Sequence, residues 1–256
     1  MINVVLLGCG NVASQLYDAF SAPSNAAVKV VQVYGRSAKK LLPFQQKTPV
    51  TTDLQQLTEA DLYLIAVSDE AVISVSDRIP GEGKLIAHTS GTVTMHAMNK
   101  LHHRGVFYPL QTFTKGVSLD FETIPLCLEA ENEENYILMD KIAQSISSHV
   151  IPLKADKRRH LHMAAVFANN FTNQLYRMAH EICEEHRLEF DLLRPLILET
   201  AQKVQRTSPF VAQTGPAKRG DVKTIEKHLE LLSTKEQKEI YTLLTHRIAK
   251  IYGKEL

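Results

Sequence analysis

The first twenty residues constrain the fold more than any other part of the chain. Residues 2–7 form a short apolar run that leads directly into the glycine-rich residues 8–13. The run is too short for a helix and is bounded by glycine, so it is typical of a buried strand. Val12, Leu16 and Phe20 then recur every four residues, as on one face of a helix. The pattern predicts a strand, a glycine turn and a helix.

This arrangement is typical of a dinucleotide-binding turn. Gly8 permits the tight turn, Gly10 lets the backbone approach a pyrophosphate, and the small Ala13 lets helix and strand pack closely. The start of the helix points unpaired N–H groups and a positive dipole end at the phosphates. A purely structural glycine turn in another α/β protein is the alternative. The predicted cofactor contacts in the turn are Gly8, Cys9, Gly10, Asn11, Val12 and Ala13.

The end of the second predicted strand indicates which cofactor is bound. Residues 28–34 are rich in β-branched side chains and end before Gly35, Arg36 and Ser37. NAD enzymes place an Asp or Glu here for the ribose 2′-hydroxyl, whereas an Arg accommodates a 2′-phosphate. No acidic residue lies in residues 35–40, and Arg36 and Ser37 offer a guanidinium and a hydroxyl. We therefore predict NADP (NADPH), although an exposed loop arginine can be incidental.

Further strands alternate with helical segments. Residues 61–67, 84–88 and 106–108 have the apolar character of strands. Such alternation predicts a mostly parallel sheet, in which ligands bind beyond the carboxyl ends of the strands. Residues at the strand ends are therefore predicted to line the nicotinamide end of the site. We expect Val67, Ser68, Ser90 and Gly91 to contact the cofactor and Gln111 to contact the substrate.

The chain changes character near residue 153. Residues 125–129 and 149–153 are the last predicted strands, and only helical periodicity follows. Residues 155–186 contain no Gly or Pro and predict one long helix, whereas residues 208–220 are predicted to be a loop. We predict an α/β fold with two domains: a Rossmann-like domain over residues 1–153 and an all-helical substrate and dimerisation domain over residues 154–256.

Composition excludes several classes of function. The 256 residues are 44% hydrophobic and 22% charged, with a net charge of +1 and no basic cluster typical of a nucleic-acid surface. No apolar run is long enough to span a membrane. The three cysteines are unpatterned and no signal peptide is recognisable, so a cytoplasmic protein is expected. Histidine spacing predicts no metal site.

Two segments of the second half resemble a specific bacterial family. They are residues 162–170 on the long helix and residues 214–221, together with Thr224 and His228. Members of that family combine a Rossmann-like NADP-binding domain with a helical domain of unknown function. The first half is similar to pyrroline-carboxylate and ketopantoate reductases and to hydroxyisobutyrate-type dehydrogenases. The resemblance implies a dimeric NADP-dependent oxidoreductase whose helical domain is of the 6-phosphogluconate-dehydrogenase type; it does not establish the substrate.

The resemblance also exposes a departure. Hydroxyisobutyrate-type dehydrogenases carry a catalytic lysine one turn before an asparagine; here Asn170 matches the asparagine, but Val166 occupies the lysine position. Valine cannot donate a proton. His162 lies one further turn back on the same predicted face, and a histidine can act as a general acid. We therefore predict His162 and Asn170 as catalytic, although a histidine satisfied at an interface is the alternative.

Arg219 and Asp221 are predicted to bind the substrate, with a loop-stabilising ion pair as an equal alternative. The leading hypothesis is an enzyme that moves hydride between NADPH and a small polar carbonyl or imine compound held in a cleft against the helical domain. The rival hypothesis is a non-catalytic NADP(H)-binding sensor or scaffold, in which the missing lysine reflects lost catalysis.

Overall fold

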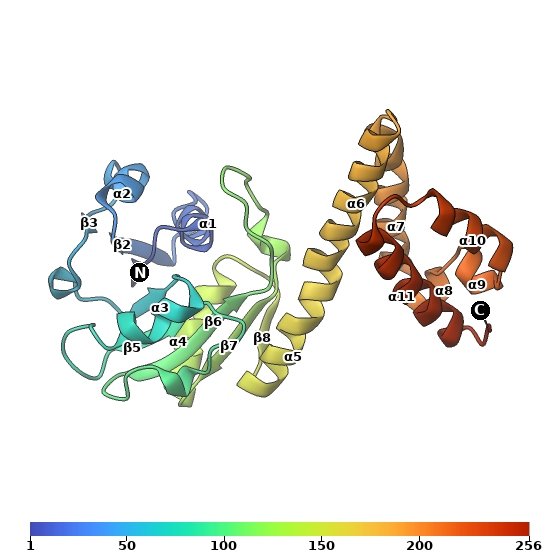
Figure 1. Cartoon of the computed structure of the whole chain (residues 1–256). Helices are drawn as coiled ribbons and strands as arrows, with labels where there is room; N and C mark the ends of the chain where they lie inside the picture. The colour runs from blue at the N-terminus through green and yellow to red at the C-terminus, as the bar shows by residue number, and fades with distance from the viewer. Residues whose placement is uncertain (256) are drawn as a thin grey trace. The chain divides into compact units, whose positions relative to one another are not determined.

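The computed structural model describes residues 1–255, which form two compact units, Met1–Asn170 and the residues from Phe171 onward (Figure 1). The predicted boundary at residue 153 lies directly after the last strand. The first compact unit continues for one further helix, to Asn170.

The first unit is built on one eight-stranded sheet with the order β3-β2-β1-β4-β5-β6-β7-β8. All neighbouring strands are parallel except β6 and β7, which are antiparallel. The two-residue strand β3 was not predicted from the sequence. The strands are β1 (Ile2–Leu7), β2 (Val28–Tyr34), β3 (Val50–Thr51), β4 (Leu62–Ile65), β5 (Leu85–His88), β6 (His103–Pro109), β7 (Leu126–Ala130) and β8 (Val150–Pro152).

Helices cover both faces of this sheet, and the central strands are therefore buried on both sides. Val4 and Leu6 pack with helices α1 (Asn11–Phe20), α2 (Ala38–Gln45) and α4 (Glu133–Gln144). Val5 and Leu7 point to the other face, where helix α3 (Asp69–Ser76) packs. Short 3₁₀ turns complete the unit at η1 (Leu54–Gln56), η2 (Met95–Ala97) and η3 (Phe121–Thr123). The predicted Rossmann-like fold is confirmed.

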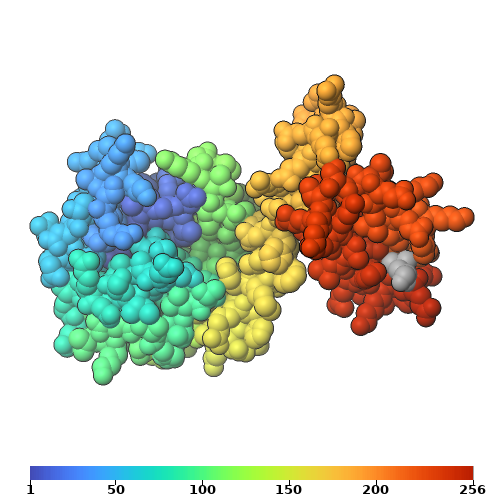
Figure 2. All heavy atoms as spheres, in the orientation of Figure 1, coloured from blue at the N-terminus to red at the C-terminus, as the bar shows by residue number. Residues whose placement is uncertain are grey.

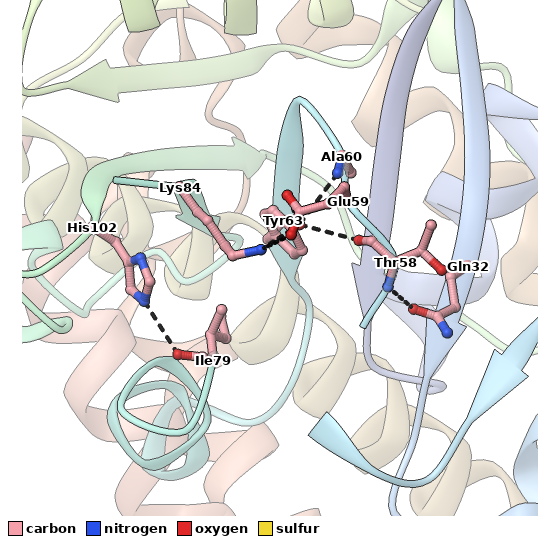
Figure 3. Close-up of polar contacts among 8 residues, drawn as sticks. All are labelled: Gln32, Thr58, Glu59, Ala60, Tyr63, Ile79, Lys84 and His102. Carbon is pink, nitrogen blue, oxygen red and sulfur yellow. Dashed lines mark hydrogen bonds and ion pairs between the residues drawn. The ribbon is translucent and has the colours of Figure 1, made fainter. Parts of the chain in front are cut away.

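A polar network fixes the loops at the amino ends of β4, β5 and β6 (Figure 3). The Lys84 ammonium donates to Glu59 at 2.7 Å and to the Tyr63 phenol at 3.0 Å. The Tyr63 hydroxyl in turn donates to the Thr58 carbonyl at 3.1 Å, and His102 contacts the Ile79 carbonyl at 3.3 Å. These contacts involve the sheet edge where the parallel strands begin. They leave the carboxyl edge for a ligand.

The helical segment after β8 is interrupted by a π-helical turn. Helix α5 (Ala155–Ala165) is followed by the π-helical segment η4 (Val166–Phe171) and then by helix α6 (Thr172–Glu185). The sequence predicted one uninterrupted helix over residues 155–186, because a wide turn leaves no mark in residue periodicity over six residues. Such wide turns occur often at functional sites.

All secondary-structure elements among the described residues of the second unit are helices (Figure 1), and Figure 2 draws the same residues as spheres toward the red end of the colour bar. Pro195 lies in the first turn of α7, and Thr234 and Gln237 form a capping box at the start of α11. The predicted loop 208–220 was wrong in part, because Pro209 and Pro216 start two short helices. Beyond α6, the elements are η5 (Phe190–Leu193), α7 (Arg194–Arg206), α8 (Pro209–Ala212), α9 (Pro216–Arg219), α10 (Val222–Leu231) and α11 (Lys235–Ile251).

A buried arginine anchors helix α5 to the sheet. The Arg158 side chain is fully buried; it pairs with the Glu129 carboxylate on β7 and donates to the Val93 carbonyl at 2.6 Å. The Glu129 side chain is only 11% exposed, so water screens this pair little. The arginine therefore fixes the start of α5 against strand β7 and the loop that follows β5.

Replacing Arg158 is expected to destabilise the protein strongly. The substitution Arg158→Met leaves Glu129 as an uncompensated buried charge, which costs about 3–5 kcal/mol of unfolding free energy in urea titrations. Arg159→Met is the matched control, because Arg159 is 58% exposed and lies 3.7 Å from Asp156; it should cost less than about 1 kcal/mol. Equal losses in the two variants would contradict the anchoring role.

Candidate cofactor and substrate site

A hollow of about 1000 Å³ lies at the carboxyl edge of the sheet in the first unit. It runs from the turn after β1 past the ends of β2 and β4 to the end of η4. Most of the predicted cofactor residues line it, together with two residues predicted for the substrate or for catalysis. These lining residues are Gly8, Cys9, Gly10, Asn11, Val12, Arg36, Ser37, Val67, Ser68, Gln111 and Asn170.

The glycine turn has the geometry that a close backbone approach requires. Gly8 has φ +144°, and a Cβ there would lie 2.1 Å from the Ala66 carbonyl oxygen, so no other residue fits. A Cβ on Gly10 would meet nothing within 4 Å, because Gly10 faces the open hollow. Ala13 is fully buried under the turn. Helix α1 starts at Asn11 with no acidic residue in its first turn, so its amino end presents an unopposed positive dipole.

Basic side chains gather at one end of the hollow. Arg36, Lys40 and Arg78 line it, and none of its described lining residues is Asp or Glu. Arg78 follows α3 and was not singled out in the sequence, because it lies more than forty residues beyond Arg36 (78 against 36). The pocket therefore has the charge of an anion-binding site.

A second hollow of about 430 Å³ adjoins the first. Gln111, Thr112, Asn169 and Asn170 line both. Small side chains of α5 and η4 form much of its wall, with Val166 among them, and its described lining contains no Lys, Arg, Asp or Glu. The π-helical turn brings Asn169 as well as Asn170 to the two hollows, whereas the sequence favoured Asn170 alone.

Tyr108 is a residue of this hollow that the sequence did not reveal. It lies near the end of β6, and its hydroxyl is 3.0 Å from Nδ1 of His162. Burial raises the pKa of Tyr108 to about 12. The only signal in the sequence is its place at a strand end. His162 also lines the second hollow. It lies on α5, four residues before η4 begins at Val166.

The loop after β5 supports this pair without lining the larger hollow. The Ser90 hydroxyl accepts the Thr92 and Val93 amides, each at 3.0 Å, so this side chain shapes the loop. Gly91 is buried against His162. The Ser90 amide donates to Nδ1 of the buried His88, whose pKa burial lowers to about 4, so His88 is neutral. The cofactor contacts predicted for Ser90 and Gly91 stay predictions.

The remaining predicted residues lie on the second unit. Asp221 caps helix α10: its carboxylate accepts the Thr224 hydroxyl at 2.8 Å and the Thr224 amide at 3.2 Å, which lowers the pKa of Asp221. Arg219 lies 3.9 Å from the same carboxylate. These contacts are local to the second unit, and substrate binding by either residue stays a prediction.

Two classes of feature are missing from the described residues 1–255. No group of three His, Cys, Asp or Glu side chains is arranged to hold a metal ion. No described helix is both long enough and apolar enough to cross a membrane.

Comparison with known proteins relates the chain to one family. Residues 124–248 match the family model described as a domain of unknown function, DUF2520. A solved structure of a "putative NADP oxidoreductase" from Bacteroides fragilis is 36% identical, with a TM-score of 0.88 over 97% of this chain and 98% of that chain. No curated protein matches the chain.

Two more distant structures share the fold. An imine reductase from Streptomyces aurantiacus is 14% identical, with a TM-score of 0.68 over 99% of this chain and 96% of that chain. A pyrroline carboxylate reductase from Plasmodium falciparum, solved with NADP bound, is 12% identical, with a TM-score of 0.60 over 98% of this chain and 100% of that chain.

Proposed function

We propose that this chain, which belongs to the family of the domain of unknown function DUF2520, is an NADPH-dependent reductase of a small polar carbonyl or imine compound. The observation that carries the proposal is the open hollow in front of Gly10, at the amino end of α1. Backbone N–H groups at that helix end are the ordinary binding site of a pyrophosphate.

The basic end of the larger hollow supports NADP as the cofactor. The Arg36 guanidinium and the Ser37 hydroxyl lie directly after β2, where a dinucleotide's ribose is read, and Lys40 and Arg78 add positive charge. No acidic side chain in the described lining competes for the ribose hydroxyls. A 2′-phosphate would gain charge-assisted hydrogen bonds here that NAD cannot make.

The smaller hollow supports an uncharged substrate. Its polar groups are amides, hydroxyls and the His162 imidazole, and the described lining contains no Lys, Arg, Asp or Glu to pair with a charged substrate group. Bound NADPH supplies the hydride. His162 supplies a proton to the reduced oxygen or nitrogen, and the Asn170 amide orients the carbonyl or imine. Val166, at the position of the lysine in related dehydrogenases, contributes only to the wall.

Cofactor choice can be tested at Arg36. We expect Arg36→Ala to weaken NADPH binding about tenfold to a hundredfold, the worth of one lost charged hydrogen-bond contact, and to leave NADH binding nearly unchanged. Lys39→Ala is the control, because Lys39 is an exposed cation three residues further on, in the first turn of α2, and does not line the hollow. Isothermal titration calorimetry with both nucleotides measures the effect; equal losses for NADPH and NADH would refute the assignment.

Turnover separates the reductase from a sensor. NADPH oxidation, followed by the loss of the absorbance of the reduced nicotinamide, should occur with some member of a panel of uncharged aldehydes, ketones and cyclic imines. His162→Ala should then lower kcat by about 10² to 10⁴. Full turnover by this variant removes His162 from the mechanism. Tight NADPH binding without turnover on the whole panel favours the sensor instead.

We also propose a cytoplasmic homodimer formed through the helical unit. The three cysteines are unpaired, as in a reducing compartment. Among apolar residues of the described second unit, only Cys183, Ala217, Ile225 and Ala249 are buried. Large apolar side chains are instead exposed there, including Leu192 at 73%, Leu196 at 62% and Leu243 at 70%. Apolar exposure of this kind marks an interface.

Sedimentation equilibrium tests the dimer. We expect twice the chain mass for the wild type, and a shift toward monomer when Leu192 and Leu196 are both replaced by Asp, because the charges would have to be buried in the interface. Ile73→Asp on α3, also exposed but in the first unit, is the control. A monomeric wild type contradicts the proposal.

A further inference from the structure

Tyr108 and His162 form a hydrogen-bonded pair in the lining of the smaller hollow. The phenol oxygen lies 3.0 Å from Nδ1, and the rings meet edge to face with centroids 6.0 Å apart at 68°. Both residues line the smaller hollow, Tyr108 from β6 and His162 from α5. The pair therefore joins the sheet to the helix at the wall of the proposed substrate site.

The missing side chain of Gly91 makes room for this pair. A Cβ on Gly91 would lie 2.6 Å from Nδ1 and 2.8 Å from Cγ of His162, and 3.0 Å from Cζ of Tyr108. The Nδ1 edge of the imidazole is thus enclosed between Gly91 and Tyr108. Nε2, on the other edge, has no hydrogen-bond partner among the described residues and is left for the hollow.

The direction of the hydrogen bond follows from the surroundings of Tyr108. Its phenol is buried and keeps its proton at neutral pH. The titratable and charged groups that act on it are Cys127 from β7, Arg158 from α5 and Asp69 from α3. Among the described residues, Nδ1 is the only acceptor within hydrogen-bond distance of this hydroxyl, and a buried hydroxyl proton without an acceptor is costly, so the phenol donates to Nδ1. An Nδ1 that accepts leaves the ring proton of a neutral imidazole on Nε2.

We propose that Tyr108 is a positioning residue that holds His162 as the neutral tautomer with its proton on Nε2, directed at the substrate. This inference rests on the proposed reductase function only for its catalytic consequence. As the substrate carbon accepts hydride and NADPH is oxidised, Nε2–H gives its proton to the substrate oxygen or nitrogen. Nδ1 takes the Tyr108 phenol proton in the same step. Water then reprotonates Nε2, and Nδ1 returns its proton to the phenolate, which restores the starting tautomer.

The tautomer can be measured without turnover. Nitrogen-15 NMR of the full chain labelled at histidine, at about pH 8 where an ordinary imidazole is neutral, distinguishes protonated from unprotonated ring nitrogens. For His162 we expect a proton on Nε2 and a hydrogen-bonded Nδ1 without a proton. The His162 resonances are assigned as those that disappear in the variant His162→Gln. In Tyr108→Phe the Nδ1 resonance should move to that of a free nitrogen. A proton on Nδ1 in the wild type, or spectra unchanged by Tyr108→Phe, overturns the proposal.

The second unit offers a matched control. The Tyr241 hydroxyl lies 2.9 Å from Nδ1 of His228, with the rings again edge to face. Tyr241→Phe should change the His228 resonances and leave those of His162 unaltered. If Tyr108→Phe fails to fold, Gly91→Ala places a Cβ against the Nδ1 edge of the same imidazole and should give the same loss of the Nδ1 hydrogen bond. An undisturbed His162 signal in that variant overturns the proposal.

Activity gives the second readout. Tyr108→Phe should lower kcat for the reduction about tenfold to a hundredfold with an unchanged KM for NADPH, because only the proton step is impaired. An unchanged kcat overturns the positioning role. A wild type that shows the expected tautomer but never oxidises NADPH refutes the proposed function while supporting the pair, so the two failures are distinguishable.

Discussion

The close approach of two backbone segments at Gly8 is the constraint on which the rest of the site depends. Strand β1 ends against the carbonyl of Ala66 at the end of β4, at a distance that only glycine tolerates. This contact lets the chain turn directly into α1, with Ala13 buried beneath the turn. The amino end of α1 therefore opens onto the carboxyl edge of the sheet, where its dipole and free N–H groups meet a hollow instead of protein.

A second constraint places the proposed proton donor. Arg158 pairs with Glu129 inside the protein, and this fixes the first turn of α5 against the sheet. His162 follows one turn later, where Gly91 leaves space for its ring and Tyr108 offers a phenol. The wide turn η4 comes next and brings Asn169 and Asn170 to the edge shared by both hollows. The ion pair of Arg158, the space left by Gly91 and the π-helical turn thus position successive residues of α5 and η4.

Periodicity and glycine chemistry predicted the local features well. The strand, turn and helix at residues 2–20 carry a pattern that only one type of fold explains, and Arg36 follows at a fixed distance after the second strand. Contacts between distant segments were not predictable. Tyr108 meets His162 across fifty-four residues of sequence, and Arg158 meets Glu129 across twenty-nine. The π-helical turn was missed because one inserted residue does not disturb an otherwise helical pattern.

Binding of NADPH to the wild type and to Gly10→Ala, measured by calorimetry, tests the central claim most directly. A Cβ at Gly10 touches no protein atom within 4 Å, so the variant should keep the thermal stability of the wild type. It should nonetheless lose NADPH affinity by about tenfold or more, because the methyl group occupies the space of the pyrophosphate. A wild type that binds no NADPH, or a variant that binds it equally well, would contradict the account.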